Sequence, residues 1–190
     1  DTVNPRYFLI LSADHIYKMD YSRMLAFHKE KGADATIATI EVDQSVCSQF
    51  GIMKVNEEDR IIGFEEKPER IEASPGSKQP LFANMGVYIF NSDVLRESLE
   101  DDAHKETNHD FGKDIIPEII RKVRVFAYNF RDENKKEAKY WRDVGTIDAY
   151  FEANMDLVAP DPALNLYDTD WPIRTYQGHY PPAKTVFAQE

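Results

Sequence analysis

Two strand-like runs on either side of an amphipathic helix constrain the fold of this chain most. Tyr7–Leu11 is a continuous apolar run, typical of a strand covered on both faces. A helix is predicted over about 21–31, with Asp20 as its N-cap and Gly32 as its stop. Residues 33–42, ADATIATIEV, are rich in β-branched side chains and predict a second strand. Strand, helix and strand form a βαβ unit, so the two strands should run parallel with a right-handed crossover.

The rest of the chain continues this alternation. Residues 51–67 predict a hairpin around Asn-Glu-Glu-Asp, and residues 71–80 predict a loop. A helical pattern over 109–123 contains Pro117, which should lie in the first turn or break the helix in two. We therefore expect an α/β class with a mostly parallel or mixed sheet flanked by helices. The remaining predicted elements are strands at 81–90 and 123–130 and helices at 91–102 and 147–158. The last helix is expected to be capped by Thr146, and its apolar side contains Ile147, Tyr150, Phe151 and Met155.

The character of the sequence changes after Val158. Five of the ten prolines lie between Pro160 and Pro182, and several aromatic residues lie among them. Flexible linkers contain fewer aromatic residues, so this composition predicts a segment that packs in an extended form along a surface. We expect an α/β unit over 1–158 and a connector over 159–190.

Composition excludes several classes of function. The net charge of −11 disfavours a non-specific nucleic-acid binder, which needs a basic face to neutralise phosphates. Cys47 is the single cysteine, so neither an intrachain disulfide nor a cysteine-rich zinc cluster can form, and a reducing, cytoplasmic setting is expected. No apolar run approaches the roughly 18–20 residues of a membrane span.

Two aspartates follow predicted strands. Asp14 comes directly after the first strand, and Asp143 lies between a short extended piece and a helix start. Ligands of open α/β sheets bind beyond the carboxyl ends of the strands, and two converging carboxylates suit Mg²⁺. The competing interpretation is that each aspartate serves only its local backbone or a neighbouring side chain, and spacing alone favours this interpretation. It would make Asp14 a turn residue and Asp143 a first-turn residue or a partner of Arg142.

Lys67 and Glu66 form a second candidate group in the stretch FEEKP. Lys67 could supply a charge for a phosphate, and Glu66 could bind sugar hydroxyls, although an ordinary exposed lysine is the simpler interpretation. Neighbouring side chains of a regular strand point to opposite faces. Both can therefore line one cleft only if the strand twists or ends there, and Pro68 makes that plausible.

The remaining polar residues give weaker indications. His28 lies on the apolar stripe of a predicted helix and is expected to pack in the core. His15 could orient the neighbouring Asp14, but a surface position is the favoured interpretation. No Gly-x-Ser-x-Gly elbow is present, which disfavours a nucleophilic hydrolase. No two glycines lie close enough to form a phosphate-cradling loop, so a triphosphate loop is expected to lie elsewhere.

Several motifs together resemble one enzyme family. The stretches LSADHIYKMDY, GFEEKP, ANMGVYIF, HDFGKDIIP, YWRDVGTIDAYFEANMDL and WPIRTY, in this order, resemble bacterial glucose-1-phosphate adenylyltransferases over essentially the whole chain. The resemblance implies a Rossmann-like nucleotidyltransferase fold. It also implies the formation of ADP-glucose and pyrophosphate from ATP and glucose 1-phosphate for glycogen synthesis, with Mg²⁺ as cofactor.

The resemblance also assigns roles to individual residues. Asp14 and Asp143 match the Mg²⁺-binding aspartates, and Lys67 matches the lysine that holds the sugar phosphate. Glu66 matches the residue on the glucose hydroxyls, and Gly51 matches the glycine whose backbone lies against the sugar. Two positions depart from the family pattern: Asn84 stands where serine is common, and Ala13 stands where glycine is common. A bulkier amide at Asn84 changes the sugar contact expected there.

The resemblance predicts further segments outside these residues. In the family, a Gly-rich loop and the adenine-binding segments come before the part matched here, and a left-handed β-helix that carries much of the oligomer surface follows it. The fold is thus expected to be incomplete on its N-terminal side, and the parent is expected to be a homo-oligomer, a tetramer. We expect the 190-residue chain alone to bind ATP poorly and to show little activity.

Three alternatives remain open at this point. The chain could belong to a nucleotidyltransferase for another sugar phosphate or nucleotide. It could also be a non-catalytic regulatory subunit, although retention of Asp14, Lys67 and Asp143 argues against this. An acidic interaction domain without chemistry is the third alternative. It predicts that the carboxylates of Asp14 and Asp143 lie far apart, whereas ligands of one Mg²⁺ should lie within roughly 3–4 Å of each other.

Overall fold

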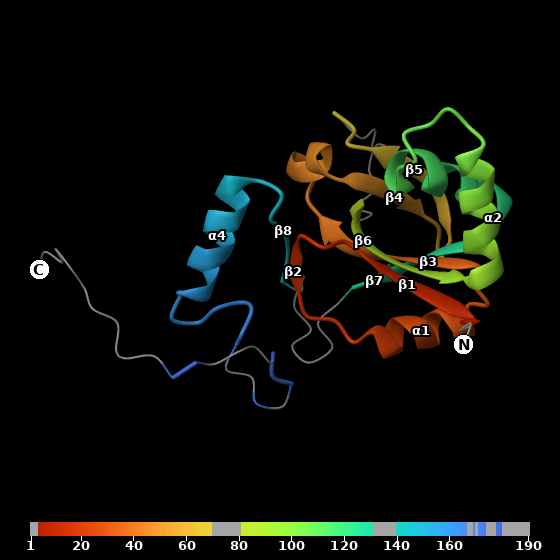
Figure 1. Ribbon diagram of the computed structural model, residues 1–190. Helices are drawn as coiled ribbons and strands as arrows, with labels where there is room; N and C mark the ends of the chain where they lie inside the picture. Colours follow the sequence, from red (N-terminus) through yellow and green to blue (C-terminus); the bar gives the residue numbers. More distant parts are fainter. Residues whose placement is uncertain are drawn as a thin grey trace, which may run out of the picture.

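A six-stranded mixed sheet forms the main body of the computed structural model (Figure 1). The structure describes residues 4–69, 81–130 and 140–166, together with 169, 171–173 and 178–179. The predicted loop at 71–80 and most of the connector beyond 166 therefore lie outside the described residues. The strands are β1 (Tyr7–Leu11), β3 (Ala35–Val42), β4 (Gly51–Val55), β5 (Ile61–Glu66), β6 (Leu81–Asn91) and β7 (Val125–Asn129).

The long strand β6 organises this sheet. One of its edges pairs with β3, and the other pairs with β4 near Ala83 and with β1 beyond Gly86. All three pairings are antiparallel, whereas β3 and β7 pair in parallel. β1 and β3 therefore run parallel, as the βαβ pattern predicted, but β6 lies between them. The α/β class with a mixed sheet is confirmed, and most of its pairs are antiparallel.

Helices cover both faces of the sheet. On one face, α1 (Tyr21–Glu30) begins at the predicted cap, where Asp20 Oδ1 accepts a hydrogen bond from Ser22 N at 2.9 Å, and it ends before Gly32, whose φ is 56°. On the other face lie α2 (Ser92–Ala103) and α3 (Ile116–Lys122). The side chains of β6 alternate between the two cores: Met85, Val87 and Ile89 pack on the α1 side, and Tyr88 and Phe90 on the α2–α3 side.

Pro117 lies in the first turn of an α-helix, one of the two predicted outcomes, and it does not break the segment, because Ile115 and Ile116 before it both keep helical dihedral angles. A π-helical turn, η2 (Phe111–Ile115), is followed by α3, in which Pro117 occupies the first turn. The hairpin is confirmed as the antiparallel pair β4–β5. A short 3₁₀ helix, η1 (Gln44–Gln49), leads into it. No helix of the described segments has both the length and the apolar character that crossing a membrane requires.

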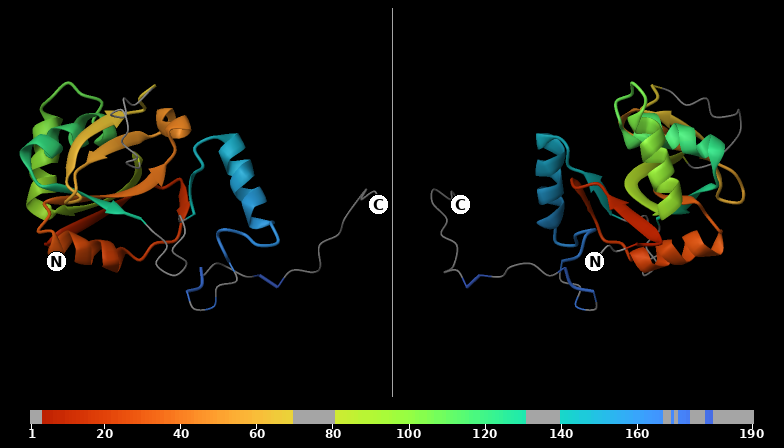
Figure 2. Two further views of the ribbon diagram at one scale, coloured as in Figure 1. Left: turned by 180° about the vertical axis from the view of Figure 1, so that it is seen from behind. Right: turned by 45° about the vertical axis from the view of Figure 1, so that its right-hand side comes forward.

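A second, smaller unit lies beside the main sheet. It consists of the two-stranded antiparallel pair β2 (His15–Tyr17) and β8 (Trp141–Asp143), followed by α4 (Ile147–Leu157). Figure 2 shows α4 standing away from the main sheet on the far side of this pair. Thr146 caps α4 as predicted, since its Oγ1 accepts a hydrogen bond from Ala149 N at 3.1 Å.

One prediction about burial is wrong for this chain, and one predicted apolar helix side lies exposed. β1 is not covered on both faces, because Phe8, Leu9 and Leu11 are 39%, 42% and 43% exposed. The apolar side of α4 is not packed against the sheet either. All four residues predicted on that side are exposed, namely Ile147, Tyr150, Phe151 and Met155.

Candidate active-site cleft

A cleft of about 450 Å³ opens where β1 and β4 separate along β6. β4 pairs with β6 up to Ala83, and β1 pairs with it from Val87 onward, so the backbone between these residues is left without a strand on that edge. Gly86 lies in this gap with a φ of 67°, and a Cβ there would collide with Ser12 Oγ. The left-handed backbone and the close contact both require glycine at this position.

One side of the cleft, here called the sugar wall after the role that the family resemblance implies for it, contains Gly51, Glu66, Lys67 and Asn84. β5 ends at Glu66, and Lys67 has a left-handed backbone with a φ of 45°. The Lys67 N–H donates to Phe50 O at 3.1 Å, which ties this turn to the start of β4. The end of the strand thus allows neighbouring residues Glu66 and Lys67 to line the same cleft, as the proline-terminated pattern suggested.

Gly51 allows close packing at the base of the sugar wall. A Cβ at Gly51 would lie 2.6 Å from the ring of Phe64 and 2.9 Å from Glu66 Oε2. Because the glycine side chain is absent, Phe64 and Glu66 can approach the backbone of β4 directly. The structure therefore gives Gly51 a role in shaping the position of Glu66.

Both ends of the Asn84 side-chain amide form hydrogen bonds with neighbouring residues of β6. Its Nδ2 donates to the Tyr88 hydroxyl at 2.9 Å, and its Oδ1 accepts from Gly86 N at 3.0 Å. Tyr88 in turn stacks on Phe111, with ring centroids 5.6 Å apart and an interplanar angle of 14°. Burial raises the pKa of Tyr88, so its hydroxyl stays protonated at neutral pH. Asn84 therefore stabilises this side of the cleft by hydrogen bonds at both ends of its amide.

The opposite side, here called the carboxylate wall, contains Asp14 and Asp143 on the β2–β8 unit. His15 is paired in register with Asp143, and Val144 N donates to Asp14 O at 3.0 Å. One ligand atom from each of Asp14, His15 and Asp143 lies within 4.8 Å of the others. Asp143 lines the cleft, whereas Asp14 lies beside Asp143 and is not among the lining residues. Two carboxylates from distant parts of the chain thus meet at one edge.

His15 is not the surface histidine that was expected. Its side chain is only 11% exposed and makes an edge contact with Trp141 at a centroid distance of 5.1 Å. His15 Nδ1 lies 2.8 Å from Met85 O, and because a carbonyl can only accept, the ring proton lies on Nδ1. Nε2 lies 3.6 Å from Asp14 Oδ1. This arrangement fixes the ring beside the carboxylate.

The local alternatives for Asp143 are resolved by its neighbours. Arg142 pairs with Asp156 at 2.7 Å and with Glu152 at 3.0 Å. The alternative in which Arg142 pairs with Asp143 is therefore wrong. Asp143 also precedes α4 instead of lying in its first turn. Its Oδ1 does accept a hydrogen bond from Gly145 N at 2.8 Å, so a local turn bond coexists with its place in the cleft.

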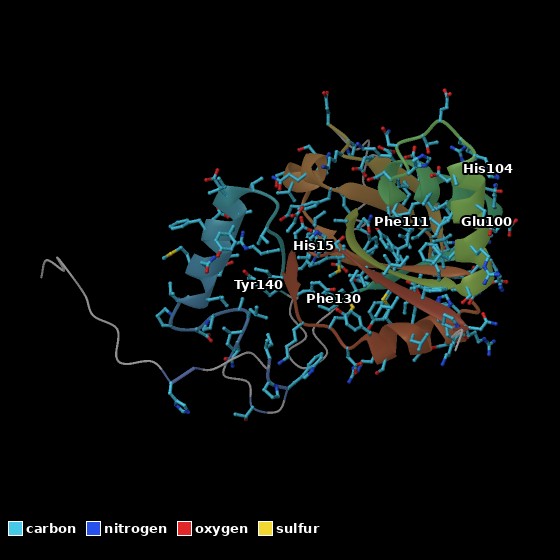
Figure 3. The ribbon with its side chains drawn as sticks, in the orientation of Figure 1. His15, Glu100, His104, Phe111, Phe130 and Tyr140 are labelled. Carbon is cyan, nitrogen blue, oxygen red and sulfur yellow. The ribbon has the colours of Figure 1, made fainter. Side chains whose placement is uncertain are left out.

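Several cleft residues were not singled out from the sequence. Figure 3 marks two side chains that line the cleft, Phe111 from η2 and His15 from β2. The sequence of the segment before η2 indicated only the start of a helix. Aromatic residues near strand ends usually pack in the core, so these residues were not distinguished from core residues. The additional lining residues include Phe50, Tyr88, His109, Asp110, Gly112 and Trp141.

The donor set at the carboxylate wall is suited to a hard divalent cation. Carboxylate oxygens are the ligands that Mg²⁺ prefers, and it commonly keeps open positions for substrate phosphates. Asp14 and Asp143 present such oxygens at an exposed edge, next to a cleft whose other wall carries Lys67. The residues present therefore fit Mg²⁺ by their chemistry.

Comparison with known proteins is consistent with this geometry. A family model described as nucleotidyl transferase matches residues 1–159. Curated proteins named glucose-1-phosphate adenylyltransferase are 53% identical in Koribacter versatilis and 50% identical in Rhodopirellula baltica, each over 98% of this chain. A protein of the same name from Shewanella sp. (strain ANA-3) is 52% identical over 96% of the chain. The chain spans 45%, 42% and 44% of the length of these three relatives, less than half in each case.

Proposed function

Because this chain belongs to the nucleotidyl transferase family, we propose that it supplies the sugar-phosphate and metal side of an enzyme that makes ADP-glucose and pyrophosphate from ATP and glucose 1-phosphate. The relatives that carry the name glucose-1-phosphate adenylyltransferase support this choice of substrates. The observation that carries the proposal is the convergence of Lys67, Glu66 and the Asp14–Asp143 pair on one cleft from separate elements.

The sugar wall binds glucose 1-phosphate in this proposal. Lys67 holds the phosphate, because a lysine ammonium at a cleft wall is a compact positive charge with three donors. Glu66 accepts hydrogen bonds from glucose hydroxyls, and the bare backbone at Gly51 lets the sugar ring approach. Asn84 contributes through the wall it holds together with Tyr88, since both ends of its amide already have partners.

The carboxylate wall would hold Mg²⁺ through Asp14 and Asp143. When bound, the ion would neutralise phosphate charge. A phosphate oxygen of glucose 1-phosphate attacks the α-phosphorus of ATP, a new P–O bond forms, and the bond to the β-phosphate breaks to release pyrophosphate. Little covalent work falls to the protein, so its residues act by positioning the two substrates in line and by stabilising charge.

The test uses the natural gene product that contains this sequence. We expect it to release pyrophosphate and form ADP-glucose from ATP, glucose 1-phosphate and Mg²⁺. Parallel assays with other nucleoside triphosphates and other sugar 1-phosphates measure specificity. Preference for another pair would assign the chain to a sister nucleotidyltransferase. Binding of glucose 1-phosphate without turnover would indicate a regulatory subunit, and the absence of both would overturn the proposal.

The homo-oligomer expected for the parent stays a prediction. Sedimentation of the same gene product measures its mass directly. The 190-residue chain alone is expected to form little ADP-glucose, because its sequence contains no Gly-rich loop to hold the triphosphate.

A further inference from the structure

A buried carboxylate lies behind the sugar wall, at the end of α2. Asp102 is only 4% exposed and does not line the cleft. It accepts hydrogen bonds from Thr107 Oγ1 at 2.9 Å and from His109 Nδ1 at 2.7 Å. The His109 N–H in turn donates to Thr107 Oγ1 at 3.3 Å. These three residues, here called the Asp102 latch, hold the connection between α2 and η2 against the end of α2.

The latch holds an unfavourable backbone conformation. His109 has a φ of 56°, in the left-handed region that is uncommon for residues other than glycine, although histidine adopts it more often than most residues do. Such a conformation persists when surrounding contacts enforce it. Here the buried carboxylate supplies the contact, and the hydrogen bond from His109 lowers the pKa of Asp102, so the acceptor stays ionised. The backbone turn at His109 thus depends on Asp102.

This turn directs the chain into the cleft. His109, Asp110, Phe111 and Gly112 all line it. Phe111 stacks on Tyr88, and a Cβ at Gly112 would lie 3.3 Å from Glu66 Oε2. A shift of the backbone at His109 would therefore reach Glu66, the proposed glucose ligand, within three residues.

We propose that Asp102 and His109 are positioning residues for the sugar-binding wall of the cleft: Asp102 lies outside the cleft, and His109, which lines it, acts through its backbone turn. This inference rests on the proposed function. It predicts that loss of the latch weakens binding of glucose 1-phosphate and leaves ATP and the chemical step largely unaffected. Errors of position of about 1 Å are enough to reduce productive binding strongly.

Two substitutions at His109 separate the backbone from the side chain. His109→Ala removes the hydrogen bond and retains the strain, and we expect it to raise KM for glucose 1-phosphate about tenfold in the natural gene product. His109→Gly also removes the hydrogen bond but adopts the left-handed backbone freely, so it should recover most of the loss. Asp102→Asn should change KM in the same direction as His109→Ala. His104→Ala, at an exposed position in the same connection, is the matched control.

The outcomes discriminate clearly. An unchanged KM in His109→Ala would overturn the inference, and so would a fall in Tm without a change in KM. Equal losses of kcat in His109→Ala and His109→Gly would also overturn it, because they would place the imidazole itself on the substrate. The wild type is assayed first. Failure of the wild type to form ADP-glucose counts against the proposed function, whereas normal wild-type activity with an unchanged variant KM counts against the latch alone.

Discussion

The sugar wall and the carboxylate wall face each other across one cleft but are supported very differently. The sugar wall is built on β4, β5 and β6, within the six-stranded sheet that has a core on each face. The carboxylate wall is built on β2 and β8, which form a separate two-stranded pair. The helix that follows, α4, leaves most of its apolar residues exposed.

This difference predicts that stability and activity depend on different regions of the molecule. Residues on the sugar wall are held by a packed sheet and by close contacts such as those of Gly51 with Phe64. Residues on the carboxylate wall depend on a few local bonds, such as Val144 N to Asp14 O at 3.0 Å. Substitution at the carboxylate wall should therefore affect activity with little effect on folding, whereas substitution in the packed cores of the main sheet should mainly affect folding.

Asp143→Asn provides the largest expected effect. It removes the charge but keeps the oxygen that accepts the hydrogen bond from Gly145. We expect kcat to fall about 10²–10³-fold, a loss typical of removing one charge-stabilising group, with Tm unchanged. Steady-state assays and thermal unfolding of the natural gene product measure both quantities. Asp148→Asn, at an exposed position in the first turn of α4, is the control and should retain activity. A large fall in Tm for Asp143→Asn would break the comparison.

Lys67→Gln tests the sugar wall. Hydrogen bonds to charged groups contribute about 1.5–3 kcal/mol, so KM for glucose 1-phosphate should rise by about 10–100-fold while KM for ATP changes little. Lys54→Gln changes another lysine of the same hairpin, which is exposed on β4 and pairs with Glu65. It should behave like the wild type. Equal effects of both substitutions would mean that Lys67 acts only through overall charge.

Local patterns were sufficient to predict most elements. The cap at Asp20, the stop at Gly32 and the hairpin β4–β5 are confirmed because each depends on a few adjacent residues. The long-range pairing of β6 with three strands was not predictable from periodicity. An antiparallel neighbour far along the chain leaves no local signal, and this pairing opens the cleft.

The candidate site was also only partly predictable from local sequence patterns. Spacing alone favoured local chemistry for Asp14 and Asp143 over a shared Mg²⁺ site, and the family resemblance reversed that order. The place of His15 was missed because its partner, the carbonyl of Met85, is a backbone group that no sequence pattern marks. For α4 only an apolar side was predicted, because hydrophobic periodicity identifies an apolar face but not what covers it.

Stability of the main body should depend on pH through His28. Burial lowers the pKa of His28, against the opposing effect of its hydrogen bond with Asn91, so the folded protein holds the ring neutral. The unfolded chain binds this proton near pH 6.5, so the free energy of unfolding should fall as the pH drops below about 6.5, by at most about 1.4 kcal/mol per pH unit. Urea unfolding between pH 7 and 5 measures the slope.

Variants of two histidines isolate this effect. His28→Gln should reduce the slope, since the titrating group inside the fold is gone. His104→Gln, at the exposed end of α2, should leave it unchanged. Equal slopes for wild type and His28→Gln would show that the pH dependence arises elsewhere.

The same substitution in the two regions gives the smallest expected effect and tests the comparison most directly. Ile37, on β3, is fully buried, whereas Ile147, on α4, is 87% exposed. Ile37→Val should lower the free energy of unfolding of this chain by about 0.5–1.5 kcal/mol, because it leaves a methyl-sized cavity in a packed core. Ile147→Val removes the same methylene from a side chain already in water and should change stability by less than about 0.5 kcal/mol. Urea unfolding of both variants in parallel measures the difference. A comparable loss at Ile147 would mean that the exposed side of α4 is buried in solution, and the two regions would then no longer differ in how they are supported.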